Sequence, residues 1–201
     1  QGEDVPGIDA DEFDDICTHI LVEEDATGKL VLPGGIEAHC HIAQESATGG
    51  MTADDYRSGS ISAAFGGNSC FVPFAAQHRN MGVIETLDLY DSRAQGASVI
   101  DYGYHLIVAD PTEKVLAEEL PEAFRRGVTS FKVFMTYDLM KIDDRQFLDI
   151  LSIAKENGAL TMVHAENSGM IAWMSERLVE VAARQLGKDP AKFRTQNFIK
   201  K

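Results

Sequence analysis

Four basic side chains that could bind a metal ion lie in or at the end of apolar, strand-like segments: His39, His41, Lys132 and His164. An unpaired Lys or His is costly to bury in such a segment, and binding a metal ion would compensate that cost. Because side chains alternate along a strand, His39 and His41 point to the same side and Cys40 points to the other. The two histidines can therefore bind one cation together.

The elements that would position these side chains alternate between strand and helix. Strands are expected at residues 31–42, 69–76, 98–109, 129–137 and 159–166. Helices are expected at residues 53–65, 81–95, 112–126, 143–157 and 168–187. Glycines follow four of these helices where a left-handed cap is favoured: Gly66 with Gly67, Gly96, Gly127 and Gly158. Such alternation predicts a parallel sheet with helical crossovers and neighbouring strands adjacent in order.

A doubly wound sheet and a (β/α)8 barrel both fit this order of elements. The candidate ligands favour the barrel, because His41, Lys132 and His164 fall near the C-terminal ends of strands, where barrel enzymes build their active sites. A closed barrel has eight units in roughly 250 residues. The sequence supplies five, and residues 188–201 offer no sixth strand. We therefore expect an α/β fold, a partial (β/α)8 TIM barrel with about five of eight strand–helix units.

Charge and composition limit the class of protein. The net charge of −14 argues against a nucleic-acid partner, and residues 1–25 hold ten acidic side chains and no Lys or Arg. No apolar run is long enough to predict a membrane span, and the N-terminus lacks the pattern of a signal peptide. The three cysteines are too scattered for a disulfide framework. We expect a cytoplasmic protein with no membrane partner.

Three segments together resemble a known family. The run ATGKLVLPGGIEAHCH (residues 26–41) is similar to the start of the barrel in the dihydropyrimidinase/D-hydantoinase family of the amidohydrolase superfamily. SFKVFMTY (130–137) and VHAEN (163–167) resemble the fourth- and fifth-strand motifs of that family. The likeness extends over about residues 26–186 in order, which makes it more specific than a single His-x-His pair.

The resemblance implies a domain arrangement. Residues 1–30 would be an acidic N-terminal segment, a remnant of the small β-sandwich domain that accompanies the barrel. Residues 31–201 would be the N-terminal part of a metal-dependent hydrolase barrel. A further zinc-binding histidine on the sixth strand and a proton-transferring aspartate on the eighth belong to the family pattern, and neither strand is among the five units.

The resemblance also implies site roles. In the family, the first-strand histidines bind one zinc ion, a carboxylated lysine bridges two zinc ions, and a fifth-strand histidine binds the second. These roles pass to His39 and His41, to Lys132 and to His164, with two zinc ions or another divalent metal as cofactors. A desolvated lysine has a lowered pKa and, as the free amine, can take up carbon dioxide to form a carbamate, in effect a long carboxylate.

Tyr137 lies five residues beyond Lys132, where the family has a tyrosine that hydrogen-bonds the substrate carbonyl. The resemblance thus implies that Lys132 and Tyr137 are catalytic and that Tyr137 also binds substrate, since a phenol aimed at a developing oxyanion stabilises it. Glu166 and Asn167 either orient the site or start the next helix. His105 is interpreted as a hydrogen-bonded core or surface histidine.

The implied reaction is hydrolytic opening of the C–N bond of a cyclic amide by a homo-oligomeric enzyme, a tetramer in the family. The related dihydroorotase branch usually has an arginine after its His-x-His, but here Ile42, Ala43 and Gln44 follow. This difference favours a neutral ring of the dihydropyrimidine or hydantoin type. Two alternatives stay open: a non-catalytic scaffold homologue of the same family, and an inactive truncated fragment.

Overall fold

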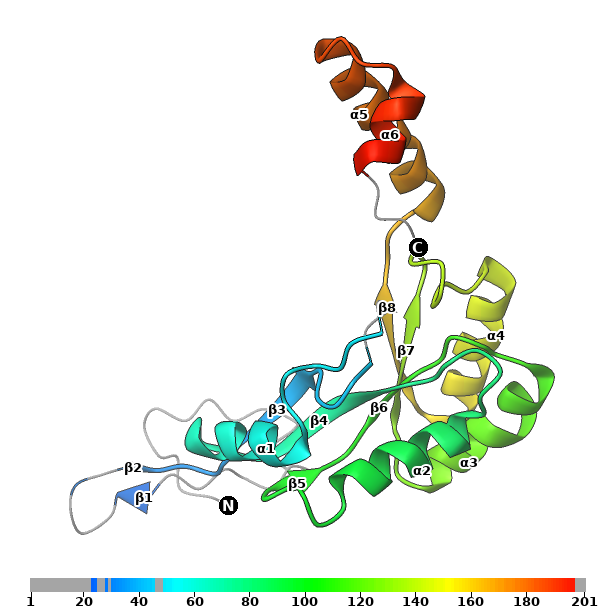
Figure 1. The fold of residues 1–201 in the computed structure, drawn as a ribbon. Coiled ribbons are helices and arrows are strands. Elements are labelled where there is room, and N and C mark those ends of the chain that lie inside the picture. The colour runs from blue at the N-terminus through cyan, green and yellow to red at the C-terminus, as the bar shows by residue number, and fades with distance from the viewer. Residues whose placement is uncertain (1–22, 25–27, 29, 46–48, 198–201) are drawn as a thin grey trace, which may run out of the picture.

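Five β-rich segments of the sequence form one parallel sheet in the computed structural model, which describes residues 23–24, 28, 30–45 and 49–197 (Figure 1). In spatial order the strands are β3 (Gly35–Cys40), β4 (Asn68–Ala76), β6 (His105–Ile107), β7 (Ser130–Phe134) and β8 (Leu160–His164). Each neighbouring pair is parallel, and the order follows the chain without reversal. The predicted partial barrel is therefore confirmed, because a doubly wound sheet requires a reversal.

Among the described residues, three short strands lie outside this series. The strand β5 (Asp101–Tyr102) pairs in parallel with β4, beside β6. The strands β1 (Glu23–Glu24) and β2 (Leu30–Val31) form a separate antiparallel pair. Most of residues 1–30 lies outside the described part of the chain, so the β-sandwich remnant and the acidic segment stay predictions.

A helical segment follows each strand of the series, as the sequence predicts. The helices are α1 (Tyr56–Phe65), α2 (Val83–Ala94), α3 (Leu120–Arg125), α4 (Asp144–Asn157), α5 (Ser168–Gln185) and α6 (Pro190–Asn197). A π-helical turn, η1 (Val115–Glu119), runs directly into α3. The described part of the polar segment 188–201 adds no strand and forms α6.

Capping side chains and glycines set the helix ends. The Asp143 carboxylate accepts a hydrogen bond from the Gln146 N–H at the start of α4, and the Gln146 side chain bonds back to Asp143 as a capping box. Gly158 ends α4 at φ 67°, a left-handed conformation that glycine adopts without Cβ strain. The expected left-handed φ is also found at Gly67, Gly96 and Gly127. The expectation of a left-handed conformation is wrong for Gly66, which is right-handed at φ −77°.

The core lies between the sheet and the helices α2, α3 and α4, which Figure 1 shows along one face of it. On β7, Phe131 and Val133 are fully buried in this core. Because strand side chains alternate, Lys132 and Phe134 lie on the opposite, inner face of the half-barrel. The same sheet thus separates an apolar core from the face that carries the polar candidate residues.

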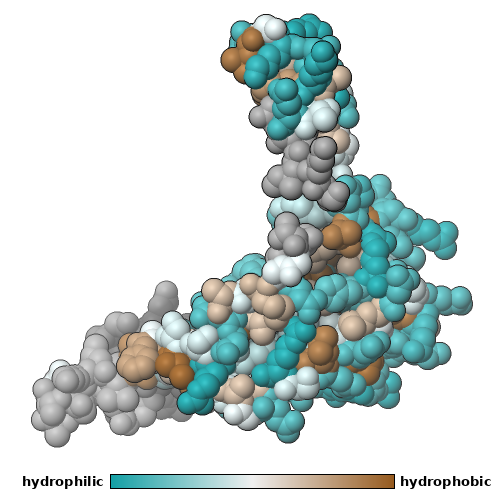
Figure 2. Space-filling view, in the orientation of Figure 1, coloured by the Kyte–Doolittle hydropathy of each residue, from teal (hydrophilic) through white to brown (hydrophobic). Residues whose placement is uncertain are grey.

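The helices α5 and α6 pack against each other and project from the end of β8 (Figure 1). Several large apolar side chains of α5 are exposed: Met170, Ile171, Trp173, Met174, Leu178 and Val181. In the view of Figure 2, hydrophilic residues dominate the surface over α2 to α4, with apolar residues scattered among them. None of the helices in the described residues combines the length and apolar character that a membrane crossing requires.

Candidate active site

The candidate residues predicted from the sequence line one cavity of about 170 Å³: His39, His41, Lys132, Tyr137 and His164, together with Phe74 and Phe134. They come from β3 and the residue directly after it, from β4, β7 and β8, and from the loop after β7. This is the C-terminal end of the strands, where barrel enzymes bind substrates. Residues that are up to 125 positions apart in sequence therefore meet, because parallel strands bring their C-terminal ends to one side.

Two aromatic rings support the candidate ligands. Phe74 is fully buried, and the His41 ring stacks on it with centroids 4.8 Å apart, while the His39 ring meets its edge at 4.7 Å. Across the cavity, Phe134 stacks with His164 at 5.4 Å and lies 5.3 Å from the Lys132 Nζ atom. The rings restrict the positions of these polar side chains without competing for their donor atoms.

Glu166 and Asn167 are each expected either to orient the site or to start the next helix, and their hydrogen bonds differ. His164 Nε2 lies 2.5 Å from Glu166 Oε2, and since a carboxylate oxygen accepts, in the neutral ring Nε2 carries the proton and Nδ1 keeps its lone pair. Asn167 instead caps α5, because its side chain accepts a bond from the Met170 N–H. Glu166 thus contacts a candidate site residue, and Asn167 begins the helix.

Backbone strain is concentrated at this end of the sheet. Among the described residues, the non-glycine residues with positive φ are Ala43, Asn80 and Tyr137, in the loops after β3, β4 and β7. A left-handed conformation is unusual for a bulky residue and costs about 1–3 kcal/mol where it is held. Tyr137, at φ 69°, accepts hydrogen bonds at its carbonyl from the Met140 and Lys141 N–H groups. This turn leaves its ring half exposed and 5.1 Å from that of His164.

Cys40 lies apart from the cavity, as strand alternation predicts, and lines a different hollow beside α1. Burial and, secondarily, the Glu37 carboxylate raise the pKa of its thiol to about 11. The thiol is therefore protonated at neutral pH and is a poor metal ligand, because metals bind the thiolate.

His105 is a hydrogen-bonded histidine, as expected, but its contacts cross the half-barrel. Its Nε2 lies 2.8 Å from the Ala38 carbonyl on β3, and its Nδ1 lies 2.5 Å from Ser130 Oγ on β7. Burial lowers the pKa of His105, against the opposing effect of the Ala38 carbonyl. The side chain thus braces β3 against β7, which no local sequence pattern indicated.

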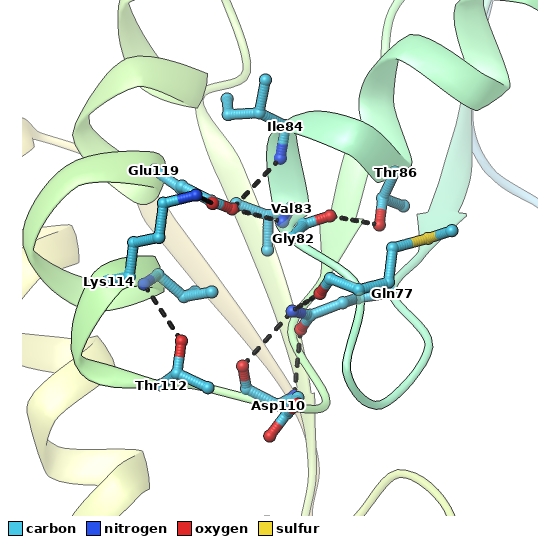
Figure 3. Close-up of polar contacts among 11 residues, drawn as sticks. Gln77, Gly82, Val83, Ile84, Thr86, Asp110, Thr112, Lys114 and Glu119 are labelled. Atoms are coloured by element: carbon cyan, nitrogen blue, oxygen red, sulfur yellow. Dashed lines mark hydrogen bonds and ion pairs between the residues drawn. The ribbon is translucent and has the colours of Figure 1, made fainter.

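Buried polar side chains hold the loops at this end together (Figure 3). Gln77, after β4, accepts hydrogen bonds from the N–H groups of Ala109 and Asp110 and donates to the carbonyls of Met81 and Asp110. All four hydrogen-bonding positions of the amide are therefore used. Gln77 ties the loop after β4 to the loop after β6.

Glu119 performs a similar function at the start of α2 (Figure 3). It accepts a 2.7 Å bond from the Val83 N–H and pairs with Lys114 Nζ at 2.8 Å. Burial opposes ionisation, but the Lys114 ammonium and the α2 N–H groups outweigh it and hold the pKa of Glu119 below its usual value. Gly82 allows this approach, since a Cβ there would lie 2.7 Å from Glu119 Oε2.

The polar side chains of the cavity have the chemistry of metal ligands, provided that Lys132 is modified. Within the described residues, no group of three or more His, Cys, Asp or Glu side chains is placed to hold a metal ion. The cavity offers three imidazoles and the Lys132 amine. An amine becomes an anionic oxygen ligand only as a carbamate, so a metal pair here depends on the modification of Lys132. The roles of the individual ligands stay predictions.

Comparisons with known proteins identify relatives over most of the chain. It is 42% identical over 158 residues to a D-hydantoinase of Geobacillus stearothermophilus and 37% identical over 156 residues to a dihydropyrimidinase of Rattus norvegicus. These matches cover 78% and 77% of this chain and 33% and 30% of the relatives. A solved D-hydantoinase structure superposes with a TM-score of 0.70 and 41% identity, over 74% of this chain and 32% of that one.

These relatives confirm the resemblance: the chain matches the dihydropyrimidinase family over part of its length. It spans about a third of the length of the curated relatives. No family model matches the sequence.

Proposed function

We propose that the chain forms part of a cyclic amidohydrolase that opens the C–N bond of a dihydropyrimidine or a hydantoin at a binuclear zinc centre. The observation that carries the proposal is the single cavity at the C-terminal strand ends lined by His39, His41, Lys132, Tyr137 and His164. The names of the relatives support the reaction class. The proposal includes a homo-oligomeric assembly, a tetramer by resemblance, and a cytoplasmic location.

In this proposal the side chains divide the work of holding the metal ions. His39 and His41 would hold one zinc ion through ring nitrogens, and His164 would hold the second through Nδ1, the atom that its bond to Glu166 leaves free. Lys132, carboxylated on Nζ, would supply carbamate oxygens to both ions. Two divalent ions in such a site supply Lewis-acid polarisation of a carbonyl and lower the pKa of a bound water.

Tyr137 acts on the substrate. Its phenol donates a hydrogen bond to the amide carbonyl oxygen, where negative charge develops as the ring opens. The left-handed backbone at φ 69° and the turn to Lys141 fix the side chain at the cavity rim. The sequence after His41 supports a neutral ring, because Ile42, Ala43 and Gln44 present no cation for a substrate carboxylate.

The carbamate can be tested on the chain as it exists. Zinc and ¹³C-labelled bicarbonate are added, and a carbamate carbon signal is sought by ¹³C NMR. We expect a signal that disappears in Lys132→Ala and persists in Lys155→Ala, which removes an exposed lysine of α4. A signal that survives in Lys132→Ala, or bound zinc without any carbamate, would contradict the bridging role.

Ring opening is the second test, followed with dihydrouracil and a 5-substituted hydantoin. We expect little or no turnover by the 201-residue chain, because the family's proton-transferring aspartate is not among its five strand–helix units and its loss typically costs ~10²–10⁴ in rate. A chain completed with the strands that its relatives have outside the matched third should be active with zinc and lose activity on Lys132→Ala. Robust turnover by the 201 residues contradicts this reasoning, and an inactive completed chain with zinc bound favours the scaffold alternative.

A further inference from the structure

We infer that Gln44 is a positioning residue that fixes His41 as its Nδ1–H tautomer and so presents Nε2 to the cavity as the metal-binding atom. The part that concerns metal rests on the proposed function. The part that concerns the tautomer does not.

The hydrogen bond between the two side chains determines the tautomer. His41 Nδ1 lies 2.6 Å from Gln44 Oε1, and an amide oxygen only accepts, so Nδ1 must carry the proton. A neutral imidazole has one protonated nitrogen, which leaves the lone pair on Nε2. The ring plane is restricted separately, because it stacks on the buried Phe74 at an interplanar angle of 17°. Both the orientation of the ring and the identity of its free nitrogen are therefore set before a metal ion arrives.

The loop after β3 is built to bring Gln44 back onto His41. Ala43 is buried and adopts a left-handed φ of 48° in the loop after the strand. This conformation is held on both sides, since the Ala43 carbonyl accepts a 2.8 Å bond from Arg93 Nη1 and its N–H donates to the Asp54 carbonyl. A strained alanine that surrounding contacts maintain is typical of a position where geometry matters for function.

The backbone of Gln44 is held as well. Its N–H donates to Thr52 Oγ1 at 3.1 Å, and its carbonyl accepts from the Thr52 N–H at 2.9 Å. The fixed main chain places the side-chain amide within reach of the ring three residues earlier. Gln44 thus acts on His41 from a prearranged position, in the way that partners of metal-binding histidines commonly do.

His105 provides an internal reference with the opposite tautomer. Its Nε2 contacts the Ala38 carbonyl, which can only accept, so Nε2 carries the proton and Nδ1 accepts from the Ser130 hydroxyl. A change at Gln44 should not alter this pattern. Any loss of it would report general disturbance of the half-barrel instead of a local effect.

The tautomers can be read from long-range ¹H–¹⁵N correlation spectra of metal-free protein labelled at its histidines, at about pH 8, where neutral rings dominate. The His41 signals are identified by their absence in His41→Asn. We expect the Nδ1–H pattern for His41 in the parent and in Gln44→Glu, which keeps an oxygen acceptor. Gln44→Leu should lose it, while Gln95→Leu, the same change at an exposed position after α2, should keep it. An Nε2–H pattern in the parent, or an unchanged pattern in Gln44→Leu with His105 intact, overturns the inference.

Zinc affinity, measured by competition with a chelator, tests the consequence. Removal of a partner of a metal-binding histidine typically weakens metal binding by about 10- to 100-fold. We expect such a loss in Gln44→Leu, and no such loss in Gln44→Glu or Gln95→Leu. Equal affinity in Gln44→Leu and the parent would overturn the positioning role. A parent that binds no zinc but shows the expected tautomers would show that the five-strand unit does not hold the metal by itself, and it would leave the tautomer assignment standing.

Discussion

Replacing Gln77 by leucine tests whether the loops at the candidate site are held by one buried amide. Leucine is similar in size but can neither donate nor accept a hydrogen bond. The substitution therefore leaves two backbone N–H groups, of Ala109 and Asp110, and two carbonyls, of Met81 and Asp110, without their partner. Gln77 itself is 3% exposed, so water replaces these bonds poorly.

The expected cost follows from the number of bonds. A hydrogen bond contributes about 0.5–1.5 kcal/mol net, so four bonds give ~2–6 kcal/mol, and the burial of the Ala109 N–H places the loss above the lower limit. We expect Gln77→Leu to lower the free energy of unfolding by about 3 kcal/mol. The matched control is Gln95→Leu, an exposed position where the change should stay within about 0.5 kcal/mol.

Urea unfolding of the parent and both variants measures these differences, with the slope of the transition checked for constancy. Amide hydrogen exchange adds a local measurement, because the Ala109 and Asp110 N–H groups should exchange faster in Gln77→Leu. A loss below about 1 kcal/mol, with the two amides still protected, would refute the reasoning, since it would mean that other groups satisfy the backbone.

Substitutions at two further positions, Glu119 and Tyr137, test an ion pair and a strained backbone at this end of the sheet. Because the pKa of Glu119 is lowered on folding, its stabilising effect is present above its unfolded pKa of about 4.3 and is lost as pH falls through the folded pKa. The urea midpoint should therefore fall less steeply from neutral to acidic pH in Glu119→Gln than in the parent. An equal dependence of the midpoint on pH in the two proteins would contradict this. Tyr137 has φ 69°, a left-handed conformation in which alanine keeps a strained Cβ and glycine does not. The free energy of unfolding should therefore be about 0.5–1 kcal/mol higher in Tyr137→Gly than in Tyr137→Ala. Equal stability of these two variants would show that the backbone there is not strained in solution.

The strand order and the positions of the candidate ligands could be predicted because both depend on repeating local patterns. Alternation of strand and helix with short connections admits few topologies, and parallel strands place their C-terminal ends on one side. His39, His41, Lys132 and His164 therefore line one cavity although they lie on, or directly after, three different strands. Period-two alternation also predicted correctly that Cys40 lies elsewhere.

Contacts between distant segments left no comparable pattern in the sequence. Gln77 bonds to residues more than thirty positions away, and His105 contacts Ala38, 67 positions earlier. Nothing distinguishes these residues from other polar side chains near strands until the fold brings their partners together. The left-handed backbone of Tyr137 was equally hidden, because a bulky residue gives no reason to expect it.

The loops around the cavity are held by contacts among the described residues. Arg93 of α2 binds the Ala43 carbonyl after β3, Gln77 binds the loop after β6, and Arg79 after β4 donates to the Lys141 carbonyl after β7. These contacts hold the loops next to the candidate metal-binding side chains within this five-strand unit, whereas the family pattern places a further zinc-binding histidine on the sixth strand and the proton-transferring aspartate on the eighth. Metal binding and catalysis should therefore separate experimentally, with the zinc, carbamate and tautomer measurements reporting on this chain and turnover reporting on its completed form.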